Sequence, residues 1–259
     1  MEETLTSALA IVLGLIVGSF LNVVIHRLPL KQDIVFRPSH CPRCQAAIPF
    51  YLNVPLLSYI VLLGRCRSCR APISPRYPLV EALTAFSFWL ATNAYGFSLH
   101  AGATAVFLSL LIALTFIDLK HMILPDELTL GGSAVFFIYS FFHPEVGPLE
   151  AVLSGGGAAL FFAALFYAYL KLRKAEGLGF GDVKMALLLG LFLGARRLTA
   201  AIFLASVSGL LVGLYFIAFK KKDLKLALPF GPFLALGGYI ALFWGDTLLA
   251  WIGTLWGRP

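Results

Sequence analysis

The segment Thr4–Ile25, TLTSALAIVLGLIVGSFLNVVI, decides the fold class. It contains 22 residues without a charge and is stopped by His26 and Arg27. As an α-helix it would extend about 33 Å, which is enough to cross the hydrocarbon core of a bilayer. An acidic start, Glu2-Glu3, precedes it in place of the basic region of a cleavable secretion signal. We therefore expect this segment to remain as the first membrane helix.

The rest of the chain repeats this pattern. Of 259 residues, 59% are hydrophobic and 13% are charged, which excludes an ordinary globular domain. The 24 glycines suit helices that pack closely in lipid. We predict an all-α polytopic membrane protein with about eight transmembrane helices, the later ones at 82–99, 101–117, 128–142, 149–170, 185–195, 198–219 and 226–245. The run 185–195 is short, about 24 Å even when it is counted from Phe180.

A basic, proline-rich segment interrupts the apolar pattern after the first helix. Residues 27–76 hold eight Lys and Arg against one Asp, and this excess of seven equals the net charge of the chain. Basic residues beside membrane helices mark the cytoplasmic side and attract anionic lipid, so a nucleic-acid partner is not needed to explain them. Eight prolines between 29 and 78 prevent a long helix there. Arg196-Arg197, in a predicted outer turn, opposes this orientation.

We therefore predict three parts: a first transmembrane helix at 1–28, a small cytoplasmic loop domain at 29–78, and a seven-helix transmembrane domain at 79–259. All four cysteines lie in the loop domain, and the pattern Cys-x-x-Cys-x-Ala-x-Ile occurs in it twice, at 41–48 and 66–73. Two such turns with a 21-residue spacer predict a tetrahedral Cys₄ site with zinc as its usual metal. The predicted ligands are Cys41, Cys44, Cys66 and Cys69.

Two other uses of the cysteines are possible. Two disulfides are disfavoured by a reducing cytoplasmic location, and a redox pair does not explain the repeat. Because four thiolates would close the coordination shell, we expect the metal to stabilise the loop rather than to do chemistry.

Two carboxylates at the ends of apolar runs are candidates for catalysis. Asp118 ends the run 101–117, and Asp182 follows Gly179-Phe180-Gly181. An ionisable group beside a membrane segment is costly and indicates function. Two carboxylates that share one proton can activate water and protonate a leaving amine. We expect Gly179 and Gly181 to permit an unusual turn and close approach of a substrate strand.

Structural roles compete with this interpretation. Asp182 could cap the helix that follows it, and for Asp126 and Glu127, after Pro125, we favour the cap. Asp118 is different, because the dipole of its own helix opposes a negative charge at the carboxyl end.

Four other polar side chains stay open between a structural and a functional role. Lys184 could pair with Asp182 or mark the inner face of the membrane. Glu81, Asn22 and Asn93 could be helix-packing contacts or site residues.

Taken in order, the motifs resemble the type IV prepilin peptidase family. The likeness covers roughly residues 12–245 and is far more specific than any single motif. It rests on Gly18 to Pro29 (GSFLNVVIHRLP), the two Cys-x-x-Cys turns, Phe116-Ile117-Asp118, Leu124-Pro125-Asp126, and Gly179 to Lys184 (GFGDVK). One departure is Lys120, a position that is acidic in some members.

The resemblance implies a bifunctional membrane aspartic endopeptidase and N-methyltransferase of type IV pilus and type II secretion systems. Its substrates would be prepilins and pseudopilins, cut after a glycine on the cytoplasmic side of the bacterial inner membrane. The new amino terminus would then be methylated with S-adenosylmethionine. Asp118 and Asp182 match the two catalytic aspartates, and the cysteine loop is typical of members that also methylate.

Two rival functions remain at this point. A transporter or proton channel would use the acids to relay ions but would not need the Cys₄ loop. An intramembrane protease without methylation would need the aspartates alone.

Overall fold

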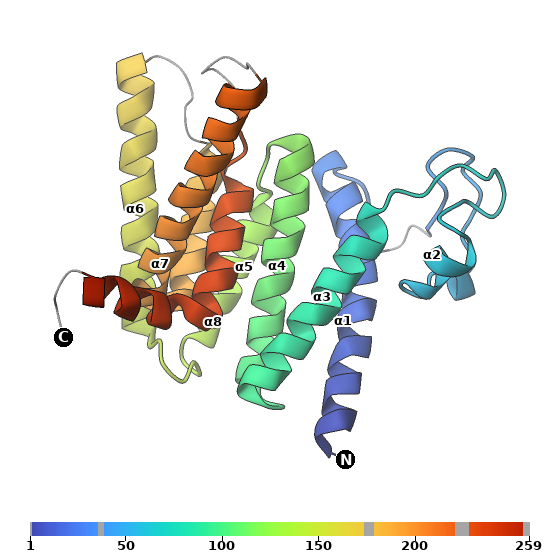
Figure 1. Cartoon of the computed structure of the whole chain (residues 1–259), viewed down its shortest axis with the longest axis horizontal. Coiled ribbons are helices and arrows are strands. Elements are labelled where there is room, and N and C mark those ends of the chain that lie inside the picture. The colour runs from blue at the N-terminus through green and yellow to red at the C-terminus, as the bar shows by residue number, and fades with distance from the viewer. Residues whose placement is uncertain (1, 36–38, 174–178, 221–227, 256–259) are drawn as a thin grey trace. The chain divides into compact units, whose positions relative to one another are not determined.

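The computed structural model describes residues 2–35, 39–173, 179–220 and 228–255. Arg37 of the basic segment and the first two residues of the predicted run 226–245 lie outside these ranges. The described chain is helical, with no strand beyond isolated bridges, so the all-α prediction is confirmed. It forms two compact units, Met1–Ala113 and Leu114–Pro259, and the division falls within the sequence of α4 (Leu99–His121). Figure 1 labels the helices along the chain.

Every predicted span has a helical counterpart. They are α1 (Glu2–Arg27), α3 (Arg76–Tyr95), α4, α5 (Asp126–Tyr139), α6 (Pro148–Arg173), two segments of α7 (Phe180–Lys220) and α8 (Gly231–Leu255). Among the described helices, five are long and apolar enough to cross a membrane: α1, α4, α6, α7 and α8. The helix α5 has only 14 residues, so it falls short of the full thickness of a bilayer.

The predicted ends of the last helix were wrong. The helix α8 starts at Gly231 rather than at 226 and continues to Leu255 rather than to 245. Pro229 precedes it and Pro232 occupies its first turn. Proline disfavours helical backbone in the residue before it but fits the first helical turn, which explains the later start.

In the first unit, α1 and α3 pack closely because of two glycines one turn apart. A Cβ atom at Gly14 would lie 2.6 Å from the Cα of Ala85, and one at Gly18 would lie 2.7 Å from the Cα of Glu81. No larger residue fits without moving a backbone. This small-xxx-small pattern lets membrane helices approach each other, and here it brings the polar side chains of α1 and α3 together.

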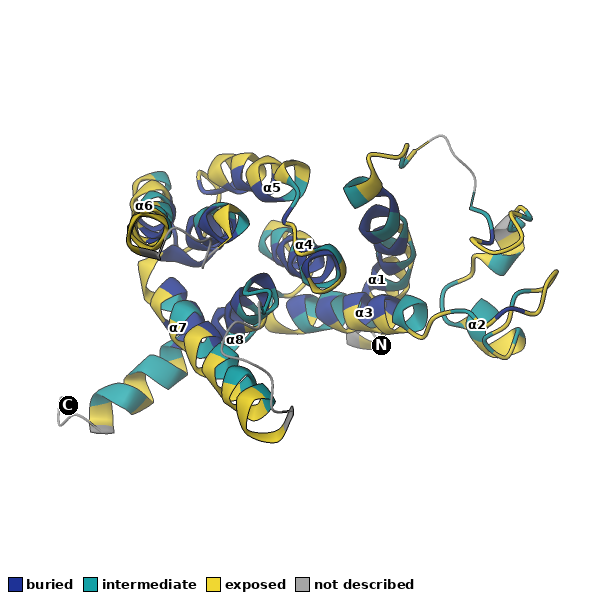
Figure 2. Cartoon of the chain, turned by 90° about the horizontal axis from the view of Figure 1, so that it is seen from above, coloured by how far each residue is buried: buried dark blue, intermediate teal, exposed yellow. Residues whose placement is uncertain are grey.

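The second unit is built around the first segment of α7. Met185, Leu188, Leu189 and Phe192 are fully buried there, whereas α6 beside it is largely exposed, as expected for a lipid-facing helix (Figure 2). Gly194 breaks α7 with φ +69°, a conformation that favours glycine. The predicted boundary between the runs 185–195 and 198–219 therefore lies at a real break.

The two arginines that opposed the predicted orientation follow the break at Gly194 and have acidic partners. Arg196 forms an ion pair with Asp246, and Arg197 pairs with both Glu145 and Asp246 at 2.8 Å. Their charges are thus compensated by acids of the same unit.

A prediction follows from the crossing of α6 and α7. A Cβ atom at Gly190 would lie 2.5 Å from the Cα of Gly155, and the hydroxyl of Ser154 donates to the carbonyl of Gly190 at 2.8 Å. Gly190→Ala should therefore force the helices apart and destabilise the protein by about 1–3 kcal/mol. Thermal unfolding in detergent measures this loss. Gly156→Ala is the matched control, because no atom lies within 4 Å of its added Cβ. Equal melting temperatures for the two variants would contradict the packing argument.

Candidate active site

Asp118 lies in the last turn of α4 and is 5% exposed. Its Oδ2 accepts a hydrogen bond from the backbone N–H of Gly231, the first residue of α8, at 3.1 Å. The amino terminus of α8 therefore offsets the unfavourable dipole of α4, because free N–H groups at a helix start favour a negative charge.

Asp182 lies in the first turn of α7 and is also 5% exposed. Its Oδ2 accepts from the backbone N–H of Gly179 at 3.2 Å. This contact reaches back from the third helical residue, as the acid of a capping box does. Asp182 is thus not the N-cap residue itself, although it helps to start the helix.

The two aspartates belong to the same unit. Leu124 packs against residues that neighbour both aspartates. A Cβ at Gly181 would lie 2.9 Å from the Cβ of Leu124, and one at Gly231 would lie 3.2 Å from its Cδ2. A single leucine therefore packs against both the residue before Asp182 and the residue that binds Asp118.

The reason predicted for the glycines was partly wrong. Neither Gly179 nor Gly181 has φ in the left-handed region. Gly181 is required instead because the side chain of Leu124 occupies the space of a Cβ atom.

The supporting charges also have partners that the sequence did not indicate. Lys184 pairs with Asp126 across 58 residues, not with Asp182, and its ammonium lies 5.4 Å from the centre of the Phe180 ring. Asp126 and Glu127 lie in the first turn of α5, whose N-cap residue is Pro125, so the predicted capping role was wrong. The negative charges of the two acids still stabilise the start of α5 by interacting with its helix dipole.

Sequence reasoning missed Gly231 and Leu124. The signal for Gly231 was the run Pro229-Phe230-Gly231-Pro232, which is typical of a helix start. The free N–H groups at a helix start can bind an anionic group such as a carboxylate. Leu124 belongs to the resemblance motif Leu124-Pro125-Asp126, but the motif gave it no role.

The four cysteines come together in the first unit. Their sulfur atoms lie within 4.8 Å of one another, and the Sγ atoms of Cys41 and Cys69 are 3.9 Å apart. A tetrahedron with metal–sulfur bonds of about 2.3 Å has sulfur atoms about 3.8 Å apart. The donor set therefore fits a structural metal, and all four thiols are free of disulfides.

The two cysteine turns repeat one backbone design. The N–H of Cys41 donates to Ala46 at 2.9 Å, and the N–H of Cys66 donates to Ala71 at 2.8 Å. Gln45 and Arg70, the residues after the second cysteines, both have φ near +60°, at 58° and 59°. The sequence repeat is thus a structural repeat that presents two pairs of thiols.

Backbone donors prepare this cluster for a cation. Hydrogen bonds from the N–H groups of Cys69 and Ser68 lower the pKa of the Cys66 thiol to about 6. The N–H of Ala46 acts to lower the pKa of Cys44, but partial burial and the neighbouring thiols raise it to about 11. Thiols this close cannot all ionise alone, whereas a bound metal ion would stabilise the thiolates.

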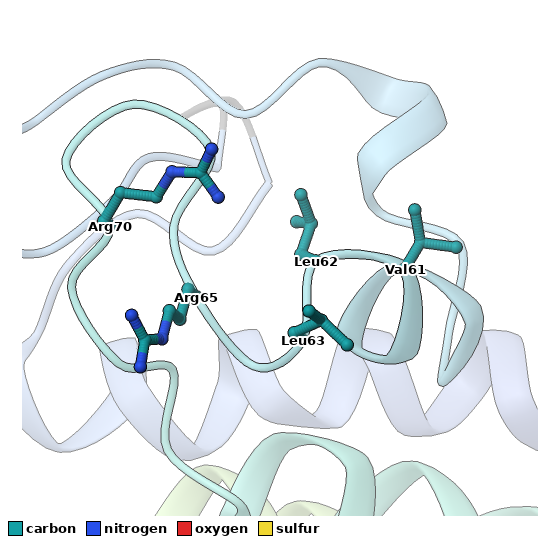
Figure 3. A pocket seen from close by; sticks show the side chains of 5 residues that line it. All are labelled: Val61, Leu62, Leu63, Arg65 and Arg70. Carbon is teal, nitrogen blue, oxygen red and sulfur yellow. The ribbon is translucent and has the colours of Figure 1, made fainter.

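A shallow hollow of about 330 Å³ lies beside the second turn. Figure 3 shows Arg65 and Arg70 on one side of it and Val61, Leu62 and Leu63 on the other. It combines an apolar wall with two groups that bind carboxylate or phosphate.

Glu81, in the other unit from the aspartates, is 8% exposed. Its Oε2 accepts from the backbone N–H of Leu56 at 2.8 Å, which attaches the cysteine loop to α3. Asn22 is 3% exposed and donates to the carbonyl of Tyr77 at 3.0 Å, whereas Asn93 is exposed.

Comparison with known proteins finds two matching family models and a set of similar proteins. Residues 12–95 match the Bacterial Peptidase A24 N-terminal domain, and residues 105–214 match the Type IV leader peptidase family. A prepilin leader peptidase/N-methyltransferase of Aeromonas hydrophila is 38% identical over 94% of this chain and 92% of its own length. The proteins of that name from Legionella pneumophila and Pseudomonas aeruginosa are 36% and 35% identical over 94% and 92% of this chain, and 93% and 90% of their own.

No solved structure gives a significant match. The two matched domains together contain both aspartates and all four cysteines. The chain therefore belongs to the type IV leader peptidase family.

Proposed function

We propose that this protein is a prepilin leader peptidase with N-methyltransferase activity. The observation that carries the proposal is the pair of buried aspartates, Asp118 and Asp182, each held by a backbone N–H at a helix start. The relatives of the same name support both activities. The substrates would be prepilins and pseudopilins with a leader that ends in glycine.

Cleavage would use the two aspartates in complementary states. Two carboxylates close together in a buried site cannot both ionise easily, so the site would hold a single shared negative charge. The ionised acid takes a proton from water, whose oxygen attacks the scissile carbonyl carbon. The protonated acid then donates to the leaving amine. The fixed N–H donors keep each carboxylate in place during this exchange.

The supporting residues would shape this site without touching the reacting atoms. Gly181 lets Leu124 pack under the start of α7, and Gly179 donates to Asp182. Lys184 would hold the starts of α5 and α7 together through Asp126.

One prediction concerns Gly181. In Gly181→Ala the new methyl group would meet the Cβ of Leu124 at 2.9 Å and displace the start of α7 that carries Asp182. Because a misplacement of about 1 Å costs about 100-fold in rate, we expect cleavage to fall by 10-fold to about 100-fold. Prepilin cleavage followed on gels measures this loss. Adding Leu124→Ala should restore part of the rate, and a double variant as slow as Gly181→Ala would contradict the contact.

The second activity needs a methyl donor and a stable cysteine loop. S-adenosylmethionine would supply an electrophilic methyl group, and Arg65 and Arg70 of the hollow would hold its carboxylate. Zinc is the metal that we propose for the four cysteines, because their spacing fits its tetrahedral thiolate sites.

We place the protein in the bacterial inner membrane with its active site toward the cytoplasm. The excess of basic residues in the loop between α1 and α3 supports this side. The division into 1–28, 29–78 and 79–259 stays a prediction.

One experiment separates this function from its rivals. Purified protein in lipid nanodiscs is mixed with a prepilin and S-adenosylmethionine, and the product is read by mass spectrometry. We expect loss of the leader and a gain of one methyl group. Cleavage without methyl transfer would indicate the rival function, a protease that does not methylate. An unchanged substrate would contradict the proposal.

A further inference from the structure

Helices α1 and α3 enclose a polar cluster that the peptidase mechanism does not use. Gly18 brings α3 close to α1, because a Cβ atom there would lie 2.7 Å from the Cα of Glu81. Asn22, one turn further along α1, bonds to the carbonyl of Tyr77, one turn back along α3. Glu81 and Asn22 are more than nine-tenths buried. Polar groups in such a place cost free energy unless they have partners or a use.

The cluster has unused hydrogen-bond acceptors. The amide nitrogen of Asn22 donates to Tyr77 at 3.0 Å and to Gly18 at 3.3 Å, but its Oδ1 is buried without a hydrogen-bond partner. The Glu81 carboxylate offers about four acceptor positions, of which the Leu56 N–H uses one. An ammonium group carries three donors and no acceptor, so it is complementary to this cluster.

The depth of the cluster fits an amine at the membrane surface. Asn22 lies five residues before the end of α1 at Arg27, and Glu81 lies five residues after the start of α3 at Arg76. Five residues of helix correspond to about 7.5 Å. The acceptors are therefore just inside the helix ends that carry the cysteine loop. A prepilin whose leader is removed on the cytoplasmic side, as the proposed function has it, carries a free α-ammonium on that side of the membrane.

We propose that Glu81 and Asn22 form the methyl-acceptor site, which binds the α-ammonium of the cleaved substrate; this inference rests on the proposed function. Asn22 Oδ1 and the Glu81 carboxylate accept hydrogen bonds from the ammonium, and the carboxylate removes one proton. The nitrogen lone pair then forms a bond to the methyl carbon of the sulfonium donor. The carbon–sulfur bond breaks, and its electron pair stays on sulfur. The product is an N-methylammonium, and the thioether leaves.

The test compares Glu81→Gln with the wild-type protein in nanodiscs. The glutamine carbonyl still accepts from the Leu56 N–H, so the attachment of the loop is kept while the base and the charge are lost. We expect normal cleavage and metal content, but methyl transfer slower by at least about 100-fold at pH 7. Thr84→Val is the control, because Thr84 is fully buried on the same helix and its hydroxyl bonds only within that helix.

Two further readouts separate chemistry from structural support. Without donor, wild-type protein should bind a pre-cleaved pilin peptide with a free amino terminus more tightly than its N-acetylated form, and Glu81→Gln should lose this preference. The deprotonated fraction of the substrate amine rises about tenfold between pH 7 and pH 9, given an α-amino pKa of about 8, so the gap in methylation rate between the two proteins should narrow by about tenfold. Arg76 and Tyr77, the titratable side chains that precede Glu81 on α3, are the same in the wild-type protein and in Glu81→Gln. The Cζ atom of Arg76 lies 5.3 Å from the centre of the Tyr77 ring.

Normal methylation by Glu81→Gln at pH 7, or an unchanged preference of this variant for the free amine, would overturn this inference. The proposed function would still stand in that case, provided that the wild-type protein cleaves and methylates the prepilin. A rate loss that is equal at pH 7 and pH 9, or shared by Thr84→Val, would assign the cluster to structure alone. Failure of wild-type protein to cleave or to methylate would instead contradict the proposed function.

Discussion

Asp182→Asn and Asp118→Asn are each expected to reduce prepilin cleavage by about a thousandfold or more, while the protein still inserts and folds. Asparagine keeps an oxygen that accepts from the N–H of Gly179 or Gly231, so the helix starts retain their hydrogen bonds. It cannot take up or deliver the shared proton. Each variant should therefore lose chemistry without losing structure, which cleavage assays and thermal unfolding together measure.

Asp126→Asn is the matched control for these variants. It removes a carboxylate from the same unit, but one that is exposed and paired with Lys184. An exposed ion pair contributes only about 0–1 kcal/mol, so cleavage should stay within a few-fold of wild type. Near-normal processing by either Asp118→Asn or Asp182→Asn would refute the proposed mechanism.

Cys41→Ser should remove the bound metal and unfold the cysteine loop. Structural zinc contributes about 10–16 kcal/mol of binding free energy in small domains, and this loop has few buried apolar residues of its own. We expect methylation to be lost first and cleavage to persist in part, because the aspartates belong to the other unit. Metal analysis, limited proteolysis and product mass measure the three effects.

Ser68→Ala provides the comparison for the cysteine variant. Ser68 is exposed within the second turn and supplies a backbone donor that alanine retains. Its metal content and methylation should match the wild type. Metal-free wild-type protein, or equal stability with and without zinc, would count against the structural metal.

The features that the sequence predicted well are those with short-range patterns. The two cysteine turns repeat eight positions at a fixed offset, and the structure repeats their hydrogen bonds. The apolar runs likewise predicted the helices, because hydrocarbon thickness sets their length. Each of these patterns depends on residues that are close in the chain.

The features that were missed or mispredicted depend on distant residues. The partner of Asp118 is 113 residues away, that of Lys184 is 58 residues away, and Gly181 is required by the side chain of Leu124. No local pattern carries such pairings. Asp126 was predicted as a cap because Pro125 precedes it, but its long-range ion pair decided its role.

The hydrogen bond from Gly231 to Asp118 has a consequence for the biosynthesis of the protein. A ribosome that has just completed α4 has still to translate α5, α6 and α7 before it reaches the donor at the start of α8. The chain therefore acquires its full aspartate geometry only once α8 has been made. Until then a nascent chain carries both acids without the complete site.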